Sequence, residues 1–326
     1  MSSKSRKHII ALCGGVGGAK LAFGLTGLLA PQDLTIVVNT GDDFEHLGLS
    51  VSPDIDTVAY TLSDLADRER GWGRKDETWN FMAALSAIGG EDWFNLGDRD
   101  LAMHVERTRR LAAGETLSRI TADLTAALGI GHPVAPMSDQ PVRTVLTTAG
   151  GEMAFQTYFV RERCQPVVSA VRYEGAAQAR PSPALAALLA RDDIAAVVLC
   201  PSNPYLSIDP ILAVPGVRAG LQALDAPIVA VSPIIGDAAL KGPAAKLMAE
   251  LGVAPGVIAL AEHYDGLLHG LVIDHANAAD AEALRALGVR PFVTDAVMHT
   301  DEDRLRLARE TLSLAAELAQ PALEHR

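Results

Sequence analysis

The sequence has few cysteines and few aromatic residues. Only Cys13, Cys164 and Cys200 occur among 326 residues, and their spacing matches neither a disulfide framework nor a zinc site. Scattered thiols in odd number are typical of a reducing compartment, so we expect a cytoplasmic protein. Aromatic residues make up 5% of the chain although 49% is hydrophobic. A core of Ala, Val, Leu and Ile follows, which is typical of parallel strands covered by helices.

Positive charge is also scarce. The chain has 28 Lys and Arg against 40 Asp and Glu, a net charge of -12, so we predict neither a nucleic-acid nor a membrane partner. No apolar run reaches the roughly 18 residues that a spanning helix needs. Glycines interrupt the apolar run of MSSKSRKHIIALC before a signal peptide is complete, so we expect no export signal. An anionic substrate would therefore need local amides, a metal ion or a few placed cations.

The order of strand and helix patterns predicts an α/β fold with one Rossmann-like domain over residues 1–326. A buried strand at 8–12 precedes a glycine turn and a helix at 19–29, and a second strand at 34–38 runs into a carboxylate-rich loop. The mostly parallel, doubly wound sheet is predicted to continue with strands at 194–200, 227–233, 257–260 and 271–274.

Between these parts we expect a helical insertion at about 64–130 and a hairpin at the edge of the sheet. The insertion would hold helices at 77–88, 100–113 and 116–128, and the hairpin would turn at Gly150 and Gly151. Arg107, Arg109 and Arg110 are predicted to lie on the solvated face of the second of these helices.

The glycine-rich stretch CGGVGGAKL, residues 13–21, could hold a phosphate. Missing side chains let backbone amides approach a diphosphate at the start of the following helix. The stretch is not a P-loop, because Ala19 precedes Lys20 and Leu21 follows it. The dinucleotide pattern also fails, since it would need Gly or Ala where Lys20 stands. A tight turn without a ligand is the alternative.

The loop after the second strand carries more carboxylates than helix capping explains. Its acidic and histidine residues are Asp42, Asp43, Glu45, His46, Asp54 and Asp56. Carboxylates beside a phosphate-binding turn are how proteins hold Mg²⁺, which takes one or two of them together with substrate phosphate oxygens. Solvated turn residues, with Asp54 as a helix cap, are the alternative. The histidines make no H-x-x-x-H pattern and there is no Ser-His-Asp elbow, so the sequence shows no covalent nucleophile.

Eight segments in order carry a family resemblance. They are GGVGGAKL, NTGDDFEHLGLSVSPDIDTVAYTLSD, LGDRDLAMH, PMSDQPVRT, FQTYFV, PSNPYLSIDPIL, SPIIGDAALKGPAAKLM and YDGL. Together they span nearly the whole chain, which resembles the 2-phospho-L-lactate transferase family of deazaflavin coenzyme F-420 biosynthesis.

The resemblance implies transfer of a phospholactyl-type group, that is lactyl, enolpyruvyl or glyceryl phosphate, from a guanosine diphosphate adduct to the deazaflavin precursor Fo, releasing GMP. It also implies a Rossmann-like fold, Mg²⁺ and a homodimer. The side-chain pattern does not choose among the three donors.

The resemblance also implies positions for the roles. Donor and acceptor binding would involve Gly14, Gly15, Gly17, Gly18, Lys20, Asn95, Asp98 and Asn203. Asp42 and Asp43 would hold the metal, and Asp42, Asp54 and Asp56 would be the catalytic carboxylates, with Asp54 or Asp56 accepting a proton. Fo would lie across the SPDID segment, and the SPIIG turn would face the guanosine.

Three other readings compete with this one. A regulatory relative that binds nucleotide sugars without transferase activity is the nearest, although it lacks the SPDID segment in this form. A dehydrogenase would need an acidic residue near the end of the second strand, where Asn39 stands. A structural or adaptor protein gives no reason for carboxylates beside a glycine turn.

Overall fold

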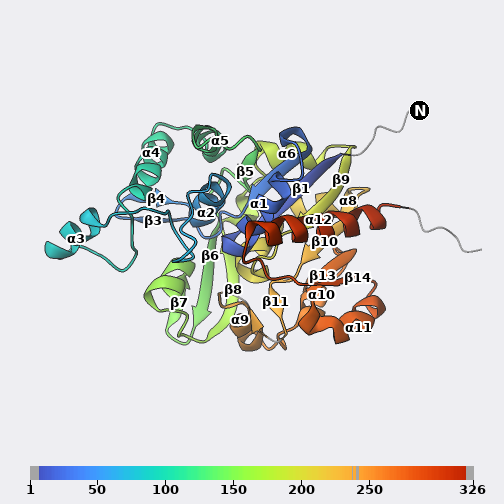
Figure 1. The fold of residues 1–326 in the computed structure, drawn as a ribbon. Coiled ribbons are helices and arrows are strands. Elements are labelled where there is room, and N and C mark those ends of the chain that lie inside the picture. The colour runs from blue at the N-terminus through green and yellow to red at the C-terminus, as the bar shows by residue number, and fades with distance from the viewer. Residues whose placement is uncertain (1–6, 237, 240–241, 321–326) are drawn as a thin grey trace, which may run out of the picture.

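A seven-stranded parallel sheet forms the centre of the molecule (Figure 1). The computed structural model describes residues 7–236, 238–239 and 242–320. Its strands, in the order in which they lie, are β14 (Arg290–Thr294), β13 (Gly270–Asp274), β10 (Ile228–Val231), β9 (Ile194–Leu199), β1 (His8–Cys13), β2 (Leu34–Val38) and β5 (Val134–Pro136). All six neighbouring pairs are parallel. The α/β doubly wound fold is therefore confirmed.

Helices cover both faces of this sheet, and β1, β2, β10 and β13 are therefore buried along their whole length. One face packs against α1 (Gly15–Thr26), α2 (Pro53–Leu62) and α12 (Asp301–Leu318). The other packs against α6 (Pro183–Leu189), α7 (Asp209–Leu212), α8 (Val217–Ala223), α10 (Val257–His263) and α11 (Ala281–Ala286). The aliphatic composition predicted this layered core.

Three helices follow α2 along the chain before β5. They are α3 (Asn80–Ala87), α4 (Asp100–Ala112) and α5 (Leu117–Ala127), with one isolated strand bridge between Ala66 and Arg74. In Figure 1, α3 lies at the far end of this stretch, away from the central sheet. Between α2 and α3 the structure describes no other strand pairing.

The hairpin around Gly150 and Gly151 exists, but it is not at an edge of the main sheet. Its strands β6 (Arg143–Thr148) and β7 (Gly151–Ala154) join β8 (Val168–Glu174) in a separate antiparallel sheet of order β7-β6-β8. The second strand is short because a π-helical turn, η2 (Thr157–Arg161), follows it. This sheet packs on α9 (Ala244–Glu250) around its own core, which includes Leu146, Tyr158 and Leu247.

Two further sequence predictions are wrong at the level of single elements. The predicted strand at 257–260 is the start of α10, which buries Val257, Leu260 and Ala261 at helical spacing. The helix predicted from residue 19 already begins at Gly15, so most of the glycines lie inside its first turns. Strands β5, β8 and β14 have no counterpart in the sequence prediction.

Small hairpins and short helical turns complete the fold. The hairpins are β3 (Phe44–His46) with β4 (Leu49–Val51) and β11 (Ile234–Ile235) with β12 (Ala238–Ala239), and the turns are η1 (Pro31–Asp33), η3 (Ala176–Gln178), η4 (Pro204–Ile208) and η5 (His275–Asp280). Part of the SPIIG segment's continuation, residues 237 and 240–241, lies outside the described residues.

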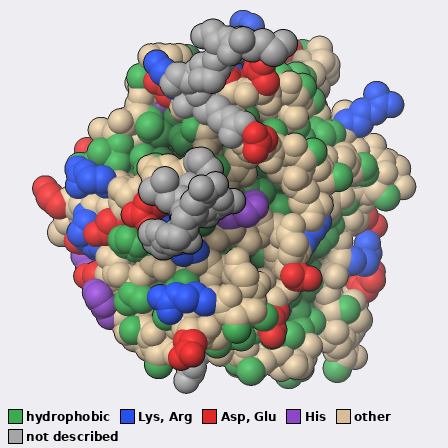
Figure 2. Space-filling model, turned by 90° about the vertical axis from the view of Figure 1, so that its right-hand side faces the viewer, with side chains coloured by type: hydrophobic (Ala, Val, Ile, Leu, Met, Phe, Trp, Pro, Cys, Tyr) green, Lys and Arg blue, Asp and Glu red, His purple; other side chains and the backbone are tan. Residues whose placement is uncertain are grey.

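Surface charge on the face in Figure 2 is mixed in sign. Lysines and arginines lie singly among acidic side chains and do not gather into a basic patch on that face. None of the helices in the described part of the chain has the length and apolar character needed to cross a bilayer.

Candidate active site

Most of the predicted site residues gather where the strand order changes direction, whereas Asn95 and Asp98 lie between α3 and α4. β1 is the first strand of the chain, and β2 and β9 lie on its two sides. The turns after these strands hold the glycines, the segment Asn39–Asp43 and Pro201–Ser207. In open α/β sheets, ligands bind at such a switch point, outside the carboxyl ends of the strands.

The glycines allow the turns after β1 and β9 to touch. A Cβ on Gly17 would lie 2.3 Å from the carbonyl oxygen of Pro201, and one on Gly18 would lie 2.5 Å from Ser202 Oγ. Ser202 Oγ in turn donates to the carbonyl of Gly14 at 2.9 Å. Packing within the protein therefore explains why these positions are glycine, whether or not a diphosphate also binds there.

The side chain of Asp54, a residue of α2, lies at the N-terminus of α1. The Gly15 amide donates to its Oδ1 at 2.7 Å, and Asn39 Nδ2 donates to its Oδ2 at 2.9 Å. Asn39 Nδ2 also lies 3.2 Å from Asp42 Oδ1 and 3.1 Å from the carbonyl oxygen of Leu206. Asn39 thus joins the turns after β2 and β9 and the start of α2, a role that the sequence analysis missed.

Three carboxyl groups of the site hold their protons more tightly than usual. Burial raises the pKa of Asp42 well above its ordinary value, and the charge of Asp54 adds to the effect. Burial also raises the pKa of Asp54 to about 6 and that of Asp43 to about 7, although Arg143 opposes the rise at Asp43. A cluster of buried carboxylates with so little cationic compensation favours binding of a cation or a proton.

Several buried polar atoms of these turns have no hydrogen-bond partner among the described residues. They are Thr40 Oγ1, Asp43 Oδ1, Thr144 Oγ1 and Asn203 Nδ2. Thr144 is next to the turn after β2, since its amide donates to the carbonyl of Gly41 at 2.7 Å. Such atoms are costly to bury, and they are expected where a ligand completes the site.

The side chains of this site could supply only some of the ligands that Mg²⁺ needs. Within the described ranges, no group of three or more His, Cys, Asp or Glu side chains is arranged to hold a metal ion. Mg²⁺ commonly takes just one or two carboxylates and completes its shell with waters and substrate phosphate oxygens. Asp42 and Asp43, with the unpartnered Asp43 Oδ1, meet that smaller requirement.

Asp56 is held by a buried arginine. Arg107, only 1% exposed, donates from Nη1 to Asp56 Oδ2 at 3.1 Å, and its Nη2 contacts Asp56 Oδ1. The predicted solvated arginine face is therefore wrong at Arg107, and also at Arg110, which is buried against Glu115 and Asp123. Only Arg109 is exposed as predicted.

The face of α4 that packs on α2 also carries a second buried acid–base pair, His104 with Asp100. His104 Nε2 lies 3.2 Å from Asp100 Oδ2, and the hydroxyl of Tyr60 donates to the same carboxylate. Burial raises the pKa of Tyr60 far above its usual value. These polar contacts attach α4 to α2 of the central domain.

Of the remaining predicted site residues, Asn203 belongs to the turn after β9, whereas Asp98 lies at the start of α3, away from the central sheet. Asp98 accepts hydrogen bonds from Thr78 Oγ1 and from the amides of Asn80 and Phe81, which lowers its pKa and caps α3. Lys20 Nζ donates to the carbonyl of Met298 at 2.7 Å. Asn203 Oδ1 accepts from the amides at the start of η4.

Asn95 is exposed beside an aromatic cluster that the sequence analysis did not identify. Phe44 of β3 packs edge-on against Phe94 with ring centroids 4.8 Å apart, and His46 packs against Trp93 at 5.1 Å. Four rings from two separated segments thus form one surface in a chain with few aromatics.

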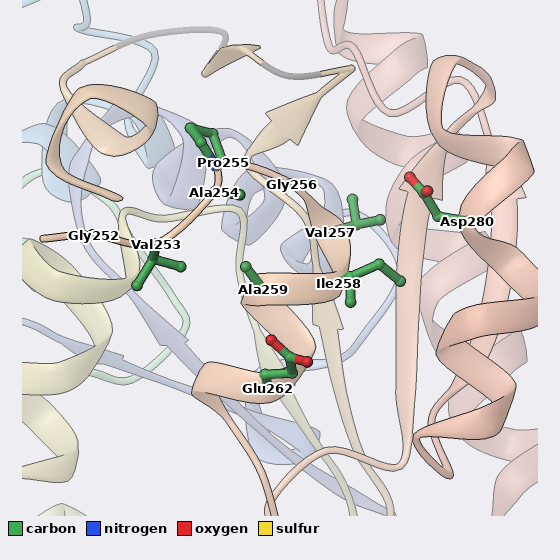
Figure 3. Close-up of a pocket in the computed structure, with 10 residues that line it drawn as sticks. All are labelled: Gly252, Val253, Ala254, Pro255, Gly256, Val257, Ile258, Ala259, Glu262 and Asp280. Atoms are coloured by element: carbon green, nitrogen blue, oxygen red, sulfur yellow. The ribbon is translucent and has the colours of Figure 1, made fainter. Parts of the chain in front are cut away.

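A hollow of about 480 Å³ lies elsewhere, along the segment between α9 and α10 (Figure 3). Its walls are Gly252–Ala259, Glu262 and Asp280, none of which is a predicted site residue. These residues include two carboxylates and no cationic or hydroxyl side chain, so the side chains would repel a phosphorylated substrate.

A doubly wound parallel sheet with buried, unpartnered polar atoms beside carboxylates at its switch point is an α/β architecture that binds a ligand at this edge. The model of the 2-phospho-L-lactate transferase CofD family matches residues 9–312. The chain belongs to this family and is a transferase.

Named relatives agree with this assignment, and a solved structure agrees with the fold. The chain is 42% identical over 320 residues to a phosphoenolpyruvate transferase of Streptomyces avermitilis, covering 96% of this chain and 100% of that one. It is 38% identical over 300 residues to a 2-phospho-L-lactate transferase of Methanosarcina mazei, with 92% and 98% covered. A UPF0052 family structure from Bacillus halodurans matches with a TM-score of 0.63 and 16% identity over 95% of this chain and 100% of that one, which shows the fold alone.

Proposed function

We propose that this chain transfers a phospholactyl-type group from a guanosine diphosphate adduct to Fo, the deazaflavin precursor of coenzyme F-420, and releases GMP. The observation behind the proposal is the cluster of buried carboxylates, Asp42, Asp43 and Asp54, at the switch point of a chain of this family. The relatives' names, which include 2-phospho-L-lactate and phosphoenolpyruvate transferase, support the substrate class. The enolpyruvyl adduct is the first donor to test, because four relatives with that name are 40 to 42% identical to this chain.

The donor would bind across the turns after β1 and β9. The amides at the start of α1 would contact its diphosphate, and the unpartnered Nδ2 of Asn203 would face the guanosine. Lys20 would have to leave the Met298 carbonyl to reach the departing GMP phosphate. Asp42 and Asp43 would hold Mg²⁺, which when bound would neutralise charge on the diphosphate.

The reaction itself needs no covalent enzyme intermediate. The terminal ribityl hydroxyl of Fo attacks the phosphorus that carries the three-carbon acid, and the bond from this phosphorus to the GMP oxygen breaks in line. GMP leaves with the electron pair, and a carboxylate accepts the hydroxyl proton. Asp54 is the better acceptor, because burial raises its pKa to about 6 and its two partners are neutral groups, whereas both oxygens of Asp56 are held by the guanidinium of Arg107.

The acceptor would lie between this centre and the helical insertion. Asn95, the capped loop at Asp98 and the cluster of Phe44, Trp93 and Phe94 border that side, and planar rings pack well against aromatic surfaces. We also propose that the protein is cytoplasmic and forms a homodimer. Light scattering on the purified protein would test the homodimer.

The test is turnover of Fo with Mg²⁺ and each of the three adducts in separate reactions, with GMP and the coupled product resolved by mass. Asp54→Asn serves as the site variant, and Asp303→Asn is the matched control, since Asp303 accepts amides at the start of α12. Product from one adduct, lost in Asp54→Asn and retained in Asp303→Asn, is expected. If a folded wild type binds guanine nucleotide but makes no product from any adduct, the regulatory alternative replaces this proposal.

A further inference from the structure

The N-terminus of α1 is filled by a carboxylate of the protein itself. Asp54, 4% exposed, accepts the amide of Gly15 at 2.7 Å. Its Oδ2 lies against the glycine turn, 2.4 Å from where a Cβ on Gly14 would be. The N-terminus of a twelve-residue helix attracts an anion through its free amides and its dipole, and here Asp54 provides that anion.

The proposed donor needs the same place. A diphosphate at the start of α1 would compete with Asp54 for the Gly15 amide, and the two negative charges would repel each other at close range. We propose that Asp54 is an internal substitute for the donor phosphate and that the donor binds by displacing it. This inference rests on the proposed function, because that function places the diphosphate at this turn.

The contacts of Asp54 indicate what displacement does to it. Only Oδ1 is bound to the glycine turn, whereas Oδ2 is bound to Asn39, which also contacts Asp42 and the Leu206 carbonyl. When the Gly15 bond breaks, Asn39 therefore keeps the carboxylate in the site with Oδ1 free. The group that accepts the proton of Fo thus becomes available only after the donor has bound.

The neighbouring turn has unused capacity for a ligand. Thr40 Oγ1 and Asp43 Oδ1 are buried without a partner among the described residues, and both side chains are more than nine-tenths buried. The contact with Asp54 therefore satisfies the Gly15 amide at the start of α1, but the adjacent groups of the neighbouring turn stay incomplete, as is expected of a site that binds a larger ligand.

The test compares GDP binding to wild type, Asp54→Ala and Asp54→Asn by equilibrium dialysis in metal-free buffer, with Asp303→Asn as control. In wild type the Asp54 carboxylate competes with the GDP phosphates for the start of α1 and so weakens the apparent affinity for GDP. Asp54→Ala lacks this competitor and should lower the GDP Kd on the order of tenfold. Asp54→Asn keeps an acceptor for Gly15 without the charge and should lie between Asp54→Ala and wild type. The control should bind GDP like wild type, and transfer by the Asp54 variants should fall on the order of 100-fold.

The outcomes separate this inference from the proposed function. If wild type turns over an adduct but neither Asp54 variant binds GDP more tightly, displacement is wrong and the transferase proposal stands. If the variants bind GDP more tightly but wild type turns over no adduct, displacement stands and the proposed reaction is wrong. Should Asp54→Ala fail to fold, Asp54→Asn decides, because its amide oxygen can still accept the Gly15 hydrogen bond.

Discussion

Replacing Asp43 by asparagine should stabilise the metal-free protein above neutral pH. Burial raises the pKa of this carboxyl from 3.8 to about 7. Because the folded protein holds the proton more tightly than the unfolded chain, the carboxyl costs no stability below pH 3.8. The cost grows as the pH rises from 3.8 to about 7 and is constant above that. A difference of about three pKa units corresponds to about 4 kcal/mol. The asparagine oxygen can still accept the hydrogen bond of Ser52.

Urea unfolding of wild type and Asp43→Asn at pH 4, 6 and 8 measures this effect. The two proteins should have nearly equal free energies of unfolding at pH 4, and the variant should be more stable by up to about 4 kcal/mol at pH 8. Added Mg²⁺ should reduce the gap at pH 8, because a cation bound to Asp43 stabilises only the wild-type site. A gap that does not change with pH, or a wild type that is more stable at pH 8 without metal, would refute the reasoning.

Three further predictions concern single contacts. Asp42→Asn should fold normally and lose the divalent-metal-dependent part of its activity; normal turnover with an unchanged metal requirement would remove Asp42 from the site. Gly17→Ala should lower the free energy of unfolding by about 1–3 kcal/mol in urea, because its Cβ would meet the Pro201 carbonyl; an unchanged midpoint would contradict this packing. Arg107→Met should cost about 3–5 kcal/mol at pH 7 in the same assay, since it leaves Asp56 buried without its arginine partner; a loss below 1 kcal/mol would mean that the pair contributes little.

The sequence predicted those parts of the fold in which local pattern and burial agree. β1, β9, β10 and β13 are short runs of aliphatic residues bounded by turn formers, and each lies in the central sheet. The four apolar residues from Val257 have the same pattern, but a run of four cannot distinguish a strand from a buried helix turn. The helix became evident only from the contacts that α10 makes with the core.

The candidate site divides in the same way. Clustering of Asp42, Asp43 and Asp54 was predictable, because all three lie in the short carboxylate-rich stretch that follows β2. The buried state of Arg107 was not, since an arginine at helical spacing looks solvated unless its partner is known. That partner, Asp56, is 51 positions away in the sequence. The role of Asn39 was hidden for the same reason, because its contacts with Asp54 and Leu206 depend on segments that come together only in three dimensions.

The position of β1 inside the sheet, between β9 and β2, also affects how the chain is made. β2 follows β1 closely, but the other neighbour of β1 is β9, with Ile194 opposite His8. At about 5–20 residues per second, the ribosome needs roughly 10–40 s to make the segment between these two residues. During that time one edge of this fully buried strand has no partner, and such edges invite pairing with other chains. A nascent chain that stops before β9 therefore lacks half of the switch point and exposes an edge that the finished protein hides.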